Sequence, residues 1–188
     1  MSDIQAVAPN DNEAGYGPVA KSFHWVIVAI LAVQFSIAWT MPDIHRGTRP
    51  EGLVGLHLSF GFAILVIAVA RLLWKIRHPV SLVIDGTPRW QYLIARATHG
   101  LLYLVLLILP VLGWANASAR GWTPSIFGLF PLPQILPTGS PLGRLLGGVH
   151  TVTAYVLLAL IGLHVAATLY HQFLLRDGTL SRMMPGNR

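Results

Sequence analysis

Four long apolar stretches dominate the pattern of hydrophobic and polar positions along this chain of 188 residues. A helix needs roughly 20 mostly apolar residues to cross the hydrocarbon core of a bilayer, and each stretch reaches that length. They cover residues 22–41, 53–74, 92–114 and 146–174. The pattern therefore predicts an all-α integral membrane protein. Residues 22–175 should form a bundle of four transmembrane helices between the tails 1–21 and 176–188.

Prolines mark where these stretches end. Proline lacks the backbone N–H that a helix interior requires, and Pro42, Pro79, Pro88 and Pro185 all lie outside the four stretches. Pro110 is the exception because it falls inside the third stretch. At that position it predicts a kink in the helix.

The overall composition excludes a soluble domain. Hydrophobic residues make up 54% of the chain and charged residues only 11%, with a mean hydropathy of +0.60. Soluble domains carry about 25% charged residues. The absence of cysteine rules out disulfides, thiolate-ligated haem, iron–sulfur clusters and the attachment motif of c-type haem. The net charge of +6 lies between apolar stretches, so it indicates a lipid partner rather than nucleic acid.

The distribution of positive charges predicts the orientation of the helices. Lysine and arginine are enriched on the cytoplasmic side of membrane proteins. Eight of them lie in or beside the two tails and the second loop, against four in the first and third loops. This asymmetry predicts that both termini are cytoplasmic. The six tryptophans fall near the ends of the stretches, as in an interfacial aromatic belt.

The third loop, residues 115–145, is the longer of the two loops on the outer side. It contains several prolines among the apolar residues Trp122, Phe127, Leu129 and Phe130. Such a composition is typical of a short segment that lies at the membrane interface. We expect the loop to cover the outer end of the bundle, where it could cap a cofactor.

Histidines carry the main chemical signal, because ionisable residues within a membrane are costly and usually functional. His150 and His164 are 14 residues apart in the fourth stretch. In a helix this spacing gives a rise of about 21 Å and about 3.9 turns, so both side chains share nearly one face. One imidazole should lie near each membrane surface.

Each of these histidines has a partner at its own depth on another helix. Because the helices alternate in direction, His57 should lie at the outer level of His150, and His24 at the inner level of His164. Four histidines at two depths fit two haems b, each with two histidine ligands. Zinc is the competing metal, but no carboxylate lies in the four stretches to complete a tetrahedral site. A relay of protons between histidines is the other alternative.

Small residues accompany the histidines. Glycine beside a ligand leaves room for a flat macrocycle, and glycine also permits close contact between two helices. Both interpretations apply to the five glycines near these histidines, which are Gly55, Gly61, Gly147, Gly148 and Gly162.

Short motifs in all four stretches carry a resemblance to a known family. They are Ser22-Phe23-His24-Trp25, Gly55-Leu56-His57, Arg71-Leu72-Leu73, His99-Gly100-Leu101-Leu102-Tyr103, Gly162-Leu163-His164 with His171, and the ending Leu180-Ser181-Arg182-Met183-Met184-Pro185. From about Lys21 to Pro185 the chain resembles the bacterial cytochrome b561 family, whose members are di-haem proteins of the inner membrane.

The resemblance implies ligation of haem b by His24, His57, His150 and His164. Stand-alone members of the family include a superoxide oxidase, which passes electrons from periplasmic superoxide through both haems to ubiquinone. The short tails of this chain look like that branch. Similar cytochromes serve as electron-transfer subunits of formate dehydrogenases and nickel–iron hydrogenases, which is the alternative function. A haem-free scaffold or transporter is a third class.

Further candidates follow from depth and charge. On the outer side the available cations are Arg46, Arg49, Arg120 and Arg144. Arg120 is the candidate contact for superoxide because it directly follows the third stretch; the alternative is that it pairs with a haem propionate or a lipid phosphate. His171 lies about two turns beyond His164 and is the candidate quinone contact. At the inner level, the candidate contacts to haem propionates or quinone are Arg71, Arg96 and His99. His45 and His78 lie in loops as ordinary surface residues.

Overall fold

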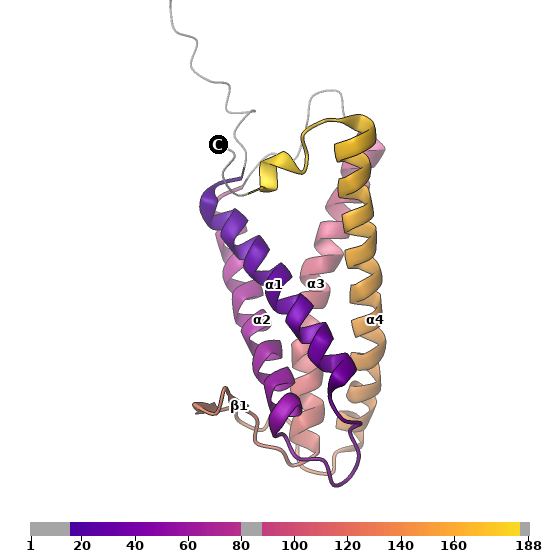
Figure 1. Ribbon diagram of the computed structural model, residues 1–188. Helices are drawn as coiled ribbons and strands as arrows, with labels where there is room; N and C mark the ends of the chain where they lie inside the picture. The colour runs from indigo at the N-terminus through magenta and orange to yellow at the C-terminus, as the bar shows by residue number, and fades with distance from the viewer. Residues whose placement is uncertain (1–15, 80–87, 185–188) are drawn as a thin grey trace, which may run out of the picture.

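The computed structural model describes residues 16–79 and 88–184. Four long helices form an up-and-down bundle (Figure 1): α1 (Pro18–Thr40), α2 (Gly52–Arg77), α3 (Arg89–Ala119) and α4 (Pro141–Tyr170). Each helix is long and apolar enough to cross a membrane. The predicted fold class, a membrane bundle of four helices, is confirmed. Of the two predicted tails, residues 1–15 and 185–188, Pro185 among them, lie outside the described residues.

The helices are longer than the apolar stretches that predicted them. α3 continues for five residues beyond Trp114, to Ala119, and α4 begins at Pro141 rather than at residue 146. Proline suits the first turn of a helix because its φ is already helical and no bond to its nitrogen is needed there. Hydropathy alone misses these extensions, because they carry polar residues such as Asn116 beyond the apolar part of the helix.

We call the end where α1 begins and α4 finishes the terminal end, and the opposite end the loop end. α3 packs extensively against α4, α1 against α2, and α2 against α3. By comparison, α1 and α4 make few direct contacts within the described residues. A small core of buried apolar side chains holds the four helices together; it contains Ile27, Ile64, Ala68, Val105, Leu106 and Leu157.

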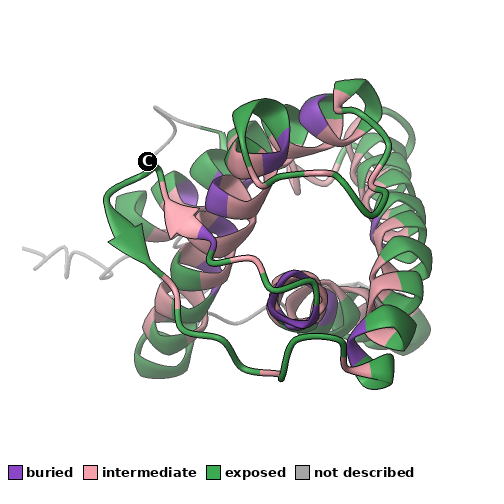
Figure 2. Cartoon of the chain, turned by 90° about the horizontal axis from the view of Figure 1, so that it is seen from below, coloured by how far each residue is buried: buried purple, intermediate pink, exposed green. Residues whose placement is uncertain are grey.

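Exposed residues cover the outward faces of the bundle (Figure 2). Many are large apolar side chains, such as Val66, Leu104 and Val152. In water this exterior would drive aggregation, whereas in a bilayer it contacts lipid chains. The arrangement therefore agrees with a helical membrane protein.

Glycines bring α3 and α4 close together at the loop end. A Cβ atom on Gly143 would lie 2.0 Å from the Cβ of Ala119, and one on Gly147 would lie 2.3 Å from Nδ2 of Asn116. Asn116 also donates a hydrogen bond to the carbonyl of Gly143 at 2.8 Å. Of the two roles considered for Gly147, the structure therefore shows close helix contact.

The other four glycines near the histidines do not bring two helices as close together as Gly147 does. A Cβ on Gly148 or Gly162 would meet no heavy atom within 4 Å. A Cβ on Gly61 would lie 3.5 Å from Nε2 of Gln34, and one on Gly55 would lie 2.8 Å from the Pro50 carbonyl oxygen.

The third loop was expected to cover the outer end of the bundle, but part of it packs against the side of α2 instead. It contains a two-stranded antiparallel hairpin of β1 (Ser125–Ile126) and β2 (Phe130–Pro131), which lies against the flank of α2 (Figure 1). The hydroxyl of Ser59 donates to the Ser125 carbonyl at 3.1 Å and accepts from the Phe127 amide at 3.0 Å. Pro124 and Leu132, at the bases of the hairpin, line the cavity inside the bundle.

After α4 the chain forms a π-helical turn, η2 (His171–Leu175), and then a short 3-10 helix, η3 (Ser181–Met183). Arg176 ends the π-helical turn with a left-handed backbone at φ 53°. The indole of Trp25 in α1 donates to the Met183 carbonyl at 2.9 Å. The segment 171–183, which we call the strap, therefore crosses the terminal end from α4 to α1 (Figure 1).

Candidate functional site

Two pairs of histidines face each other inside the bundle. At the loop end the rings of His57 in α2 and His150 in α4 have centroids 6.1 Å apart and an interplanar angle of 76°. At the terminal end His24 in α1 and His164 in α4 are 6.3 Å apart, with an angle of 71°. These are the two pairings that depth predicted.

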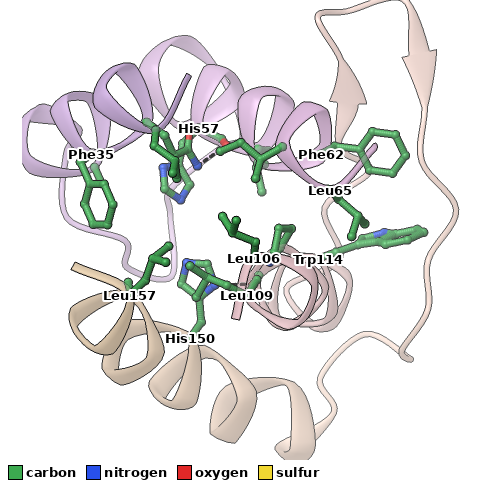
Figure 3. A pocket seen from close by; sticks show the side chains of 18 of the residues that line it. Phe35, His57, Phe62, Leu65, Leu106, Leu109, Trp114, His150 and Leu157 are labelled. Carbon is green, nitrogen blue, oxygen red and sulfur yellow. Dashed lines mark hydrogen bonds between the residues drawn. The ribbon is translucent and has the colours of Figure 1, made fainter. Parts of the chain in front are cut away.

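The loop-end pair borders a cavity of about 250 Å³. His57 and His150 point toward each other across it (Figure 3), with the apolar side chains of Leu106, Leu109 and Leu157 around them. All four helices contribute to the lining. A largely apolar cavity with a few converging polar groups is the usual form of a cofactor site.

The ring of His150 is fixed by the backbone of α3. Its Nδ1 lies 2.9 Å from the Leu109 carbonyl, which only accepts hydrogen bonds, so Nδ1 must carry the hydrogen and donate it. That contact leaves Nε2 as the nitrogen with a free lone pair, the usual arrangement of a metal-binding histidine. Gly113 makes this position possible, because a Cβ there would lie 3.1 Å from the ring.

His57 is held differently. Gln34 of α1 donates its side-chain amide to the His57 backbone carbonyl at 3.0 Å. The Nδ1 of His57 and the Oε1 of Gln34 are buried without a hydrogen-bond partner among the described residues. Buried polar atoms are normally satisfied, so these two atoms mark a place where a further group would bind.

A third histidine joins the terminal-end pair. The ring of His99 in α3 lies 5.2 Å from that of His164, closer than His24 does. Its Nδ1 is also buried without a partner in the described chain. The sequence placed His99 at this level but gave no reason to expect direct contact with His164.

Positive charges surround the terminal-end pair. The guanidinium of Arg71 approaches Nδ1 of His24 at 3.3 Å and lies 5.6 Å from the centre of the Tyr103 ring. The ammonium of Lys75 lies 4.8 Å from the same ring, and Arg96 is near enough to Lys75 to interact with it. Within residues 16–79 and 88–184 none of these three cations forms a salt bridge.

Tyr16 lies beside this group, just before α1. Burial raises the pKa of its phenol, although Arg71 and Arg182 act in the opposite direction. Tyr16 therefore remains a protonated hydroxyl at neutral pH and can donate a hydrogen bond at the terminal end.

Arg120 and His171 lie outside both histidine pairs. Arg120 is exposed; its Nε donates to Asn116 at 3.0 Å, and its guanidinium lies 5.5 Å from the centre of the Trp122 ring. It is also 3.5 Å from the His45 carbonyl. His171 contacts Asp177 in the strap, with Nδ1 and Oδ2 2.5 Å apart.

The model of the prokaryotic cytochrome b561 family matches residues 15–186. The chain belongs to this family. It is therefore a multi-pass membrane protein of a b-type cytochrome family, with a role in electron transfer and haem b as the implied cofactor.

Individual relatives cover almost the whole chain of this cytochrome. One named probable superoxide oxidase CybB, from Yersinia pestis, is 30% identical over 177 residues, which make up 92% of this chain and 97% of the relative. Cytochrome b561 homolog 2 of Escherichia coli (strain K12) is 29% identical over 170 residues, 90% of each chain. Cytochrome b562 of Cereibacter sphaeroides is 28% identical over 179 residues, 92% of this chain and 96% of the relative.

The residues present fit haem b. Each of the two pairs offers facing imidazole rings, with centroids 6.1 and 6.3 Å apart, that would hold a haem b between them. His99 lies nearer to His164, at 5.2 Å between ring centroids, and adds a third imidazole at the terminal end.

The donor set also distinguishes haem from a bare metal ion. In the described part of the chain, no group of three or more histidine, cysteine, aspartate or glutamate side chains could hold such an ion. Two imidazoles suffice when a porphyrin supplies the other four nitrogens. The zinc alternative thus finds no support in this cytochrome.

Two residues of interest were not singled out by sequence reasoning. Gln34 is a polar residue in the middle of an apolar stretch, which was a signal for a buried contact. Asp177 lies six residues after His171; nothing in that spacing predicts their contact, because the chain turns back only after a π-helical turn.

Proposed function

We propose that this cytochrome holds two haems b and transfers electrons from periplasmic superoxide to ubiquinone in the bacterial inner membrane. One haem would lie between His57 and His150, and the other between His24 and His164. The observation that carries the proposal is the presence of two facing imidazole pairs at two depths of one bundle. The relative named probable superoxide oxidase supports the choice of donor.

Haem b with two histidine ligands supplies reversible one-electron transfer without an open iron position. The chain's own residues hold and orient it. The Leu109 carbonyl fixes the ring of His150, and the apolar lining of the loop-end cavity keeps water away. In the overall reaction two superoxide anions become two molecules of O₂, and one ubiquinone takes up two electrons and two protons to become ubiquinol.

The loop end would face the periplasm and receive superoxide. Four arginines lie there against the two carboxylates Asp43 and Glu51, and excess positive charge draws small anions. Among the arginines, Arg120 is the proposed contact, because Asn116 and Trp122 hold its exposed guanidinium in place.

The terminal end would face the cytoplasm and bind ubiquinone. Arg71 and Arg96, which form no salt bridge with the described residues, are suited to haem propionates, and Arg71 would then leave the ring of His24. His99 offers a further polar contact to a propionate or to quinone. His171, the first residue of the strap that crosses this end, is the proposed quinone contact, and Asp177 of the same segment contacts its ring.

The experiment combines haem quantitation with a spectroscopic assay on protein purified in detergent. We expect two b-type haems per chain that superoxide reduces in the absence of quinone and that ubiquinone-1 then reoxidises. The surface histidine variants His45→Ala and His78→Ala should behave like the wild type. Increasing salt should slow reduction by superoxide, because it screens the attraction of the loop-end arginines.

Each alternative class has its own outcome. Two haems that are indifferent to superoxide but are reoxidised by quinone would replace superoxide with a protein donor and favour a subunit of a dehydrogenase or hydrogenase. A purified protein without haem would overturn the central claim. One haem per chain would show that one of the two histidine pairs is not a ligand pair.

A further inference from the structure

The strap brings an acidic side chain to His171. Asp177 contacts Nδ1 of His171 through Oδ2 at 2.5 Å, and its other oxygen, Oδ1, accepts from the amide of Thr179 at 3.0 Å and from its hydroxyl at 2.6 Å. Both side chains of the dyad, His171 and Asp177, are largely covered, with 22% and 20% exposure. The carboxylate is thus oriented from both sides.

The carboxyl of Asp177 is ionised at neutral pH. Burial alone would raise its pKa, but the hydrogen bonds from His171 and Thr179 hold the pKa below its ordinary value. A carboxylate only accepts hydrogen bonds, so Nδ1 of His171 must carry the proton in this contact. The other ring nitrogen, Nε2, makes no hydrogen bond within the described residues.

The backbone around the dyad is specialised. The π-helical turn places His171 at its start, and the left-handed Arg176 turns the chain back so that Asp177 reaches the ring. π-helical turns are rare and are frequent at functional sites. At its far end the strap is tied to α1 by the bond from Trp25 to Met183, and Trp25 adjoins His24, with 5.5 Å between the ring centroids.

We propose that Asp177 is a positioning residue for proton delivery, which orients His171 so that Nε2 faces the quinone at the terminal end. This inference rests on the proposed function, because it takes His171 as the quinone contact. For each proton delivered, the Nε2–H bond of the imidazolium breaks and an O–H bond forms on the reduced quinone. Nδ1 keeps its proton, Asp177 stays ionised, and water on the cytoplasmic side returns a proton to Nε2.

The dyad explains what the strap contributes beyond covering the bundle. A histidine that moves protons works best when its ring is held in one orientation and its charged form is stabilised by a carboxylate. Thr179 serves the same purpose indirectly, because it fixes the carboxylate that fixes the ring. The electrons still come from superoxide, as in the proposed function, so the balance needs no further reactant.

The test uses full-length holoprotein that has been reduced with a stoichiometric amount of dithionite and is then mixed with ubiquinone-1. We expect Asp177→Asn to lower the maximal rate of reoxidation at least tenfold while changing the KM for quinone less than threefold. Asp177→Glu should recover most of the rate, and Thr179→Val should show an intermediate loss. The matched control is Ser181→Ala, which removes the bond from Ser181 to Gly178 within the strap but leaves the dyad intact.

A second readout does not depend on activity. In histidine labelled with ¹⁵N, the His171 signal, identified by its loss in His171→Gln, should report a proton on Nδ1 in the wild type and a mixture of tautomers in Asp177→Asn. Haem content and thermal stability of each variant show whether it is folded. If Asp177→Asn is unfolded, Thr179→Val and Asp177→Glu carry the test.

The outcomes separate this inference from the proposed function. A reduced wild type that quinone does not reoxidise would reject ubiquinone as the acceptor, and the dyad proposal with it. A wild type that quinone reoxidises but superoxide does not reduce would reject only the donor. An unchanged rate and an unchanged ¹⁵N signal in Asp177→Asn, in a protein that quinone reoxidises, would overturn the role of Asp177 alone.

Discussion

The two histidine pairs have nearly the same ring separation, 6.1 and 6.3 Å, but very different surroundings. At the loop end, His57 and His150 border an apolar cavity, and the ring of His150 is held by a backbone carbonyl. At the terminal end, the pair of His24 and His164 is joined by a third histidine and by cations without carboxylate partners in the described chain. The same donor geometry therefore serves two environments.

The difference indicates a division of labour along the bundle. An apolar, carbonyl-anchored site suits electron transfer with little movement of protons. A site with His99, Tyr16 and several cations suits anionic groups and proton exchange, which quinone chemistry requires. If both ends bind haem as proposed, this contrast assigns the proton-coupled half of the reaction to the terminal end.

Removal of a proposed haem ligand should have the largest effect of the changes that test the difference between the two ends. We expect His150→Ala to lose one of the two haems and to keep the other, because the terminal-end pair shares no contact with the Leu109 anchor. The measurement is haem content per chain with a low-temperature redox spectrum, and His45→Ala is the control. Retention of both haems in His150→Ala would break the ligand assignment.

A single methyl group at Gly113 tests whether the loop-end anchor matters. The added Cβ would lie 3.1 Å from the ring of His150, so Gly113→Ala should move the ring off the Leu109 carbonyl and reduce haem occupancy at the loop end. Gly100→Ala is the matched control, because this exposed glycine of α3 is not among those beside the proposed ligands, a Cβ there meets nothing within 4 Å, and alanine favours a helix by about 1 kcal/mol over glycine. Equal haem content in the two variants would remove the anchor from the argument.

Loss of a charge at Arg71 tests the cationic character of the terminal end. Arg71→Gln should make the reduction potential of one haem more negative, because a nearby positive charge favours the reduced state; for a charge several ångströms away the shift is on the order of 100 mV. Spectroscopic redox titration measures it. The control Gln34→Leu, at the loop end, should leave the potential of that haem unchanged. A shift of both potentials in Arg71→Gln would contradict the idea that the charge of Arg71 acts at the terminal end alone.

The pH dependence of thermal stability tests the contact between Asp177 and His171 in the strap, and we expect it to show the smallest effect. The pKa of Asp177 in the folded protein lies below its ordinary value of 3.8. The carboxylate therefore contributes stability that is complete well above this value and is lost as the pH falls through the folded pKa. We expect the wild type to melt slightly higher than Asp177→Asn at neutral pH and the difference to vanish in acid. A difference that is independent of pH would show that ionisation of Asp177 is not involved.

Much of this arrangement was predictable because a helix fixes depth. With 1.5 Å per residue and 3.6 residues per turn, the spacing from His150 to His164 sets both their levels and their common face. The alternation of helices then paired them with His57 and His24. By contrast, the contact of His99 with His164 depends on how α3 is rotated against α4, and local spacing does not define that rotation.

Other features depended on contacts between distant segments. The hairpin of the third loop lies against α2 because Ser59 happens to face Ser125 and Phe127. The anchor of His150 needs Leu109 and Gly113 at one height of a neighbouring helix. Neither arrangement has a signature within a few residues of sequence.

The sequence by itself determined that the helices lie in lipid, how many there are, and at what depth each imidazole lies. These properties follow from the length of the apolar stretches and from the rise of a helix per residue. The tertiary structure alone decided which histidine lies nearest to which, where the cations gather, and that Asp177 returns to His171. These properties depend on the rotation and packing of whole helices and on one left-handed turn at Arg176, which bring together residues that the chain order keeps apart.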